Sequence, residues 1–124
     1  MKHRILIVED EQVLADAMRE FLLCEGYDVD CAAEREEAEA LLAHYNYSLV
    51  ITDLALSPLG LSGVNILDIL ADQAKRPKVI VYSGQPVPDL ESLLGSGRAD
   101  VFLQKPQSLE KVARIARDLI GCAP

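Results

Sequence analysis

The sequence has few of the residues that build disulfide and metal sites. Its 3 cysteines (Cys24, Cys31 and Cys122) contain no C-x-x-C pair, and its 2 histidines, His3 and His44, lie far apart. An odd number of thiols without ligand spacing argues against a disulfide framework or a zinc site, and two separated imidazoles argue against a histidine-based metal site. We therefore expect reduced thiols and a cytoplasmic location.

Positive charge and long apolar runs are also scarce. The 124 residues include 12 lysines and arginines against 20 acids, a net charge of −8. Because binding to a nucleic-acid backbone depends on lysine and arginine, we expect no direct nucleic-acid partner. The first apolar run, in MKHRILIVED, meets acids at once. No signal peptide or membrane span fits that pattern, and we expect no membrane partner.

Short apolar runs alternate with helical patterns along the whole chain. The runs predict strands buried on both faces at residues 4–8, 48–52, 78–82 and 101–103. Around residues 27–31 apolar residues alternate with aspartates, which predicts a further strand with one wetter face, nearer a sheet edge. This alternation predicts one α/β domain over residues 1–124, with a parallel sheet covered by helices on both faces.

Apolar residues at helical spacing predict the helices between these strands. They are expected over residues 11–24, 38–45, 63–74, 89–94 and 109–120. The first should bury one side composed of Val13, Leu14, Ala17, Phe21 and Leu22, and should stop before Gly26. The acid-rich residues 34–39 (EREEAE) are expected to form a solvated helix face.

Polar side chains follow four of the predicted strands. Glu9 and Asp10 end the first, Asp53 the central one, Ser83 the fourth and Lys105 the fifth. In a doubly wound sheet these ends share one rim, where ligands bind. Clustered carboxylates need a cation, and Mg²⁺ suits oxygen ligands shared with a phosphate. Hydroxyl and ammonium groups suit the phosphoryl oxygens, so we predict that Asp53 is a nucleophile forming an aspartyl phosphate.

The motifs ILIVEDE, SLVITD, VIVYSG and FLQKP, in this order, resemble the receiver domains of two-component response regulators. The resemblance covers nearly the whole chain. It implies a CheY-like, flavodoxin-like fold with strand order 2-1-3-4-5. It also implies that Asp53 is phosphorylated from a phosphohistidine on a histidine kinase or phosphotransfer protein. Mg²⁺ would be held by Glu9 (directly or through water), Asp10, Asp53 and the backbone carbonyl of Ala55.

The same resemblance implies a switch. Ser83 and Lys105 would contact the phosphoryl group, and Phe102 would move inward when Ser83 is drawn toward it. The surface read by partners would be the fourth helix, fifth strand and fifth helix, about residues 88–121. A downstream protein, a fused output domain or a second copy could use this face. The Lys105–Pro106 peptide bond would be cis.

Four features depart from the usual family pattern. The acid pair is Glu-Asp where Asp-Asp is commoner, and the loop after Asp53 (LALSPLGLSG) is longer than usual, which displaces Pro58. Ala55 offers only its carbonyl, and Gln85 flanks the path of an attacking water. We expect Ala55 to slow the loss of the phosphoryl group. Phe102 also lacks the hydroxyl of the more usual tyrosine.

Three other functions remain open. A receiver-like scaffold could bind partners constitutively without phosphorylation, which the lengthened loop would favour. A phosphatase of the haloacid dehalogenase kind would need a second aspartate where Ala55 stands. A flavin-binding module would place an acidic loop against the flavin phosphate. We favour a switchable interaction module that is no turnover enzyme beyond its own phosphorylation and slow self-dephosphorylation. No output domain is expected within these residues.

Overall fold

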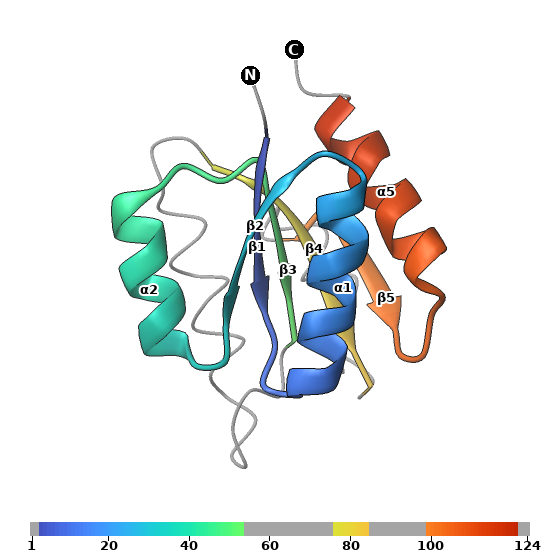
Figure 1. Ribbon diagram of the computed structural model, residues 1–124, viewed down its shortest axis with the longest axis horizontal. Helices are drawn as coiled ribbons and strands as arrows, with labels where there is room; N and C mark the ends of the chain where they lie inside the picture. The colour runs from blue at the N-terminus through green and yellow to red at the C-terminus, as the bar shows by residue number, and fades with distance from the viewer. Residues whose placement is uncertain (1–2, 54–75, 85–98, 122–124) are drawn as a thin grey trace.

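The strands form one parallel sheet with the order β2-β1-β3-β4-β5 (Figure 1). The computed structural model describes residues 3–53, 76–84 and 99–121. Its elements are β1 (Arg4–Val8), α1 (Gln12–Cys24), β2 (Asp28–Ala32), α2 (Arg35–His44), β3 (Leu49–Thr52), β4 (Lys78–Ser83), β5 (Val101–Gln104) and α5 (Leu109–Gly121). The predicted doubly wound α/β fold and its strand order are confirmed.

The central strands are continuous apolar runs because helices cover both faces of the sheet. All four residues of β3 are buried, and in β1 only the first residue is partly exposed. Strand β2 has the wetter pattern predicted for it and lies at the edge of the sheet. The register pairs Ile7 of β1 with Cys31 of β2 on one side and with Ile51 of β3 on the other.

Two hydrophobic cores lie on opposite faces of the sheet. Alternate residues of a strand point to opposite faces, so Ile5 and Ile7 pack with α1 and α5. Leu6 and Val8 pack with α2 instead. Figure 1 shows α1 and α5 beside each other, and the two helices are in contact. The sheet is therefore packed on both faces, and the two cores hold its strand ends in place.

Three details of the predicted helices are wrong. Val13, predicted on the buried side of α1, is 79% exposed. The buried side of α1 is formed by Ala15, Met18 and Leu22. Because of the helical period, position 13 falls on a different side of the helix, which faces solvent. Helix α1 begins one residue later than predicted. Helix α2 ends at His44, which leaves Tyr45 outside the helix and 46% exposed.

The predicted stop after α1 is confirmed at Gly26. Its φ of 98° lies in the left-handed region that glycine adopts at little cost, and its N–H donates to the carbonyl of Leu23. The predicted helices over residues 63–74 and 89–94 lie outside the described residues.

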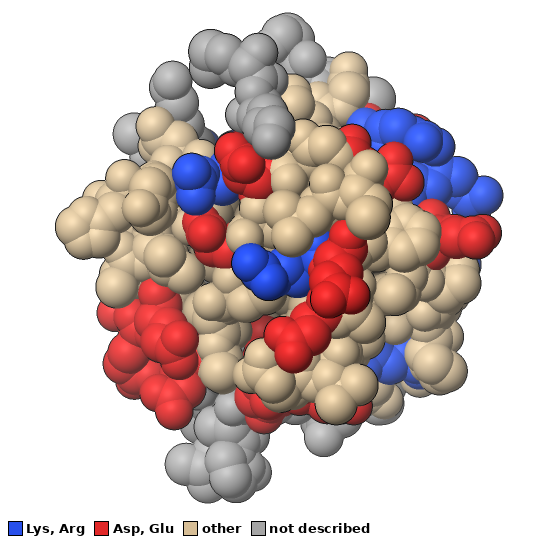
Figure 2. Space-filling view, viewed as in Figure 1, with Lys and Arg blue, Asp and Glu red and all other residues tan. Residues whose placement is uncertain are grey.

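Acidic side chains gather over the lower end of α2 in Figure 2, and basic side chains lie over α5. The four glutamates of residues 34–39 are exposed, as the sequence predicts. Among the described helices, none is long and apolar enough to cross a membrane.

Candidate functional site

The candidate site lies where the parallel strands end, at one rim of the sheet. Glu9 follows β1, Asp53 follows β3, Ser83 is the last residue of β4 and Lys105 follows β5. Backbone hydrogen bonds continue past the strand ends and hold these positions. The N–H of Asp53 donates to the carbonyl of Val8 at 3.1 Å, and the N–H of Lys105 donates to the carbonyl of Ser83 at 2.9 Å.

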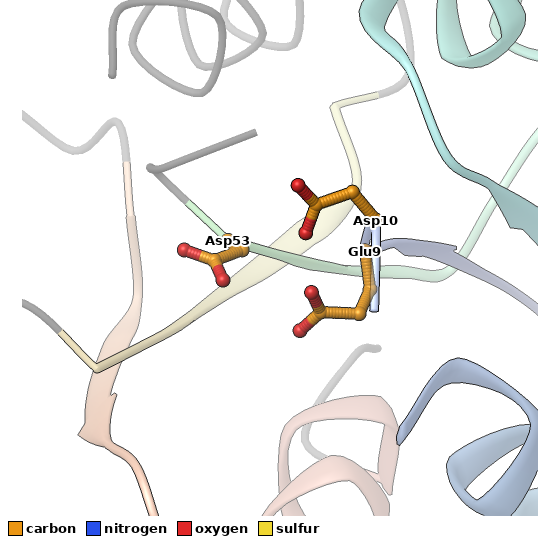
Figure 3. A group of neighbouring side chains, drawn as sticks. All are labelled: Glu9, Asp10 and Asp53. Carbon is orange, nitrogen blue, oxygen red and sulfur yellow. The ribbon is translucent and has the colours of Figure 1, made fainter. Parts of the chain in front are cut away.

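Three carboxylates converge at this rim. One oxygen each of Glu9, Asp10 and Asp53 lies within 4.8 Å of the other two (Figure 3). Glu9 and Asp53 are buried, whereas Asp10 is exposed. The structure thus brings together the three acids that the sequence predicts at this place.

Lys105 supplies a positive charge to this cluster. Its Nζ donates to Oε1 of Glu9 at 2.5 Å and to Oδ2 of Asp53 at 2.8 Å. Its side chain is 18% exposed, against 2% for Glu9 and 8% for Asp53. The aliphatic stem runs beside Gly84, where a Cβ would lie 3.9 Å from the Lys105 Cβ and Cδ. The ammonium group therefore lies between two buried carboxylates.

Burial and pairing act in opposite directions on the titration of this pair. Burial raises the pKa of Glu9 above its ordinary value, although the hydrogen bond from Lys105 works against that rise. Burial by itself would lower the pKa of Lys105, but the hydrogen bonds to Asp53 and Glu9 outweigh it and raise that pKa. The ammonium form of Lys105 is therefore the one that the site stabilises.

The carboxylate cluster fits a small, hard divalent cation. Mg²⁺ binds oxygen atoms at about 2.1 Å, so two of its ligands lie at most about 4.2 Å apart. Because the three acids offer oxygens within 4.8 Å of one another, a small movement of side chains would bring them onto one ion. Oxygen-only donors are also the set that Mg²⁺ prefers.

The remaining predicted residues fall into two groups. Ser83 is fully buried at the end of β4, and Phe102 is half-buried in β5, paired in register with Val81. Ala55 and Gln85 lie outside the described residues. The Lys105–Pro106 peptide bond is cis.

The sequence interpretation missed the contact between Glu9 and Lys105. It treated Glu9 only as a metal ligand, whereas the structure pairs its Oε1 with Lys105 and its Oε2 with the backbone N–H of Glu11, at 3.2 Å. The sequence did contain a signal for this contact, because only one lysine is predicted at a rim with three acids. Which acids it meets depends on side-chain reach across the sheet.

Known proteins similar to this chain point to one family. Residues 5–117 match the family described as the response regulator receiver domain. The chain is 37% identical over 121 residues to the transcriptional regulatory protein PmrA of Pectobacterium parmentieri, covering 94% of this chain and 52% of PmrA. It is 30% identical over 113 residues to the cell cycle transcriptional regulator CtrA of Caulobacter vibrioides, covering 90% of this chain and 48% of CtrA. The chain thus spans about half the length of these curated relatives.

Solved structures of response regulators and their receiver domains are also similar to this chain. The non-phosphorylated HemR receiver domain of Leptospira biflexa is 27% identical with a TM-score of 0.85, covering 99% of this chain and 98% of that one. The response regulator TrrA of Thermotoga maritima, in complex with Mg²⁺-BeF, is 30% identical with a TM-score of 0.78, covering 96% and 99%. The family match over residues 5–117 and the shared fold show that the chain belongs to the response regulator receiver domain family.

Proposed function

We propose that this receiver domain accepts a phosphoryl group on Asp53 and acts as a phosphorylation-controlled interaction module. The observation that carries the proposal is the position of the Asp53 carboxylate. Asp53 directly follows the central strand β3, and its carboxylate accepts a hydrogen bond from Lys105 and lies beside two further acids. Carboxylates of this kind act as nucleophiles toward phosphorus. The family matched over residues 5–117 supports a role in two-component signalling.

The transfer requires one bond to form and one to break. A carboxylate oxygen of Asp53 attacks the phosphorus of a phosphohistidine, and the P–N bond breaks with its electron pair left on the imidazole of the histidine kinase or phosphotransfer protein. The Lys105 ammonium offsets charge on the phosphoryl oxygens. The Ser83 hydroxyl donates a hydrogen bond to another of these oxygens.

Glu9, Asp10, Asp53 and the carbonyl of Ala55 are the groups proposed to hold Mg²⁺. When bound, this ion neutralises negative charge between the carboxylates and the incoming phosphoryl group. TrrA of Thermotoga maritima, at 30% identity, was solved in complex with Mg²⁺-BeF, which supports the assignment of the metal.

The output is proposed to pass through Phe102 and the face over residues 88–121, of which β5 and α5 belong to the described part. Phosphorylation adds charge at one point and biases a two-state element elsewhere. Downstream proteins, an output domain on a longer chain or a second copy of this domain are the proposed readers. PmrA and CtrA are named transcriptional regulators and are about twice as long as this chain, which supports an output domain.

Intact mass spectrometry tests the proposal. The wild-type protein, incubated with Mg²⁺ and acetyl phosphate, should gain one phosphoryl group, and the gain should disappear in EDTA and in Asp53→Ala. The matched control is Asp118→Ala, an exposed aspartate of α5, which should be phosphorylated like the wild type. The decay of the added mass also measures whether the phosphoryl group is lost slowly, as expected from Ala55.

Two outcomes would reject the proposal. One is a gain of mass that persists in Asp53→Ala, which would place the phosphoryl group elsewhere. The other is a folded wild-type protein that gains no mass from acetyl phosphate or from a phosphohistidine donor. That second result would favour the constitutive scaffold.

A further inference from the structure

Both carboxylate oxygens of Glu9 are held by hydrogen bonds. Oε1 accepts from the Lys105 ammonium at 2.5 Å, and Oε2 accepts from the backbone N–H of Glu11 at 3.2 Å. Glu11 occupies the N-cap position of α1, and the Glu9 side chain is only 2% exposed. The carboxylate therefore lies between the start of α1 and the ammonium group and is hydrogen-bonded to both.

The contact with Lys105 crosses the sheet. Glu9 follows β1 and Lys105 follows β5, and two strands, β3 and β4, separate β1 from β5. A lysine ammonium is a point charge on a flexible stem with rotatable donors. The ammonium has two acceptors, Asp53 after β3 and Glu9 after β1.

We infer that Glu9 is a positioning residue for Lys105, holding the ammonium beside Asp53 before a phosphoryl group arrives. The length of the glutamate is the property that matters, because it gives the carboxylate its reach to β5. The inference rests on the proposed function only in that Lys105 is the group that meets the incoming phosphoryl oxygens.

The variants Glu9→Asp and Glu9→Gln separate the effect of side-chain length from the effect of charge. An aspartate at position 9 keeps the charge but draws the carboxylate back by about 1.5 Å, one carbon–carbon bond. The contact with Nζ would then be about 4 Å, too long for a hydrogen bond. A glutamine keeps the reach and an acceptor oxygen but has no charge. If length decides, Glu9→Gln preserves the position of Lys105 better than Glu9→Asp does.

The test is the rate at which the Lys105 ammonium protons exchange with water, measured by ¹⁵N NMR on metal-free protein. The chain has five lysines, and the signal is assigned by its absence in Lys105→Met. Glu9→Asp should speed the exchange about 10-fold or more, the factor that corresponds to one lost hydrogen bond between charged groups. Glu9→Gln should stay within about 2-fold of the wild type.

Asp10→Asn is the matched control for removing negative charge nearby. Among the described residues, no hydrogen bond joins Asp10 to Lys105. The Lys105 protons of Asp10→Asn should therefore exchange at the wild-type rate. Three results would overturn the inference: unchanged exchange in Glu9→Asp, faster exchange in Glu9→Gln than in Glu9→Asp, or an equal effect of Asp10→Asn. Circular dichroism establishes that each variant is folded. If Glu9→Asp does not fold, a release of Lys105 in Glu9→Gln still refutes the role of length.

If the wild-type protein itself takes no phosphate, the proposed function fails, but the exchange rates of the metal-free protein still decide the role of Glu9.

Discussion

Asp30 of β2 accepts two hydrogen bonds on a single oxygen. Arg4 of β1 donates to its Oδ2 at 2.8 Å, and the Tyr47 hydroxyl donates to the same oxygen at 2.7 Å. The Arg4 guanidinium also lies 4.3 Å from the centre of the Tyr45 ring. Burial raises the pKa of Tyr47 well above its ordinary value, and the hydrogen bond to Asp30 adds to that rise. This network joins β1, β2 and the segment before β3.

Replacing Tyr47 by phenylalanine should lower the free energy of unfolding by about 1.5 to 3 kcal/mol at pH 7, because one hydrogen bond to a carboxylate is lost. The difference should shrink above pH 10. The folded-state pKa of Tyr47 is raised, so above pH 10 the unfolded wild type loses this proton before the folded protein does. Wild-type stability then falls by up to about 1.4 kcal/mol per pH unit, a loss that the variant cannot show.

Urea unfolding of both proteins between pH 7 and pH 11 measures this difference. All other groups that titrate in this range are common to the two proteins, so the difference isolates Tyr47. Parallel stability profiles above pH 10 would contradict the prediction.

Helices α1 and α2 both begin without a side-chain cap. Their N-cap residues are Glu11 and Glu34, and neither makes a capping hydrogen bond. Glu34 has the extended backbone that a cap requires, with φ −135° and ψ 160°. Helix α2 carries Glu36 and Glu37 in its first turn, which favours its start through the helix dipole. A shorter acid at position 34 would add the missing hydrogen bond.

Glu34→Asp should raise the free energy of unfolding by about 0.5 to 1 kcal/mol, because aspartate is a strong N-cap whose carboxylate reaches the N–H groups of the first turn. Glu34 is exposed and keeps its charge in this variant. Urea unfolding measures the change. Glu34→Gln is the control that keeps the length without gaining a cap, and an equal stability of the two variants would refute the capping argument.

One sheet stabilises the molecule by burying a separate core on each face. Leu22 of α1 belongs to the core shared with α5, and Leu42 of α2 belongs to the core on the opposite face. Both leucines are buried, at 1% and 6% exposure. Because the sheet lies between the two cores, a cavity in one should not be relieved by movement in the other.

The variants Leu22→Val and Leu42→Val should each lower the free energy of unfolding by about 1 kcal/mol, the usual loss for one buried methylene group. In the double variant the two losses should add to within about 0.5 kcal/mol, because the sites share no partners. Urea unfolding of the four proteins completes the cycle. A coupling well above that limit would mean that the two cores deform together through the sheet.

Local sequence patterns were sufficient for the strands and insufficient for some helix faces. Strand β1 has the predicted bounds because its apolar run is bounded on both sides by charged residues. Val13 is exposed although the sequence predicts it buried, because it stands next to the apolar residues of the buried side of α1 and has the same chemical character. The start of α1 and the end of α2 differ from the prediction because Glu11 and Tyr45 have extended backbones there, which the spacing of apolar residues does not encode.

The sequence by itself determined which polar residues end the strands. Glu9, Asp53, Ser83 and Lys105 are found where apolar runs stop, and that is a local property. Only the tertiary structure decided which of them touch. The contacts of Lys105 with Glu9 and Asp53 join residues 96 and 52 positions apart. Such contacts depend on strand order and on the reach of each side chain across the sheet, which no local pattern records.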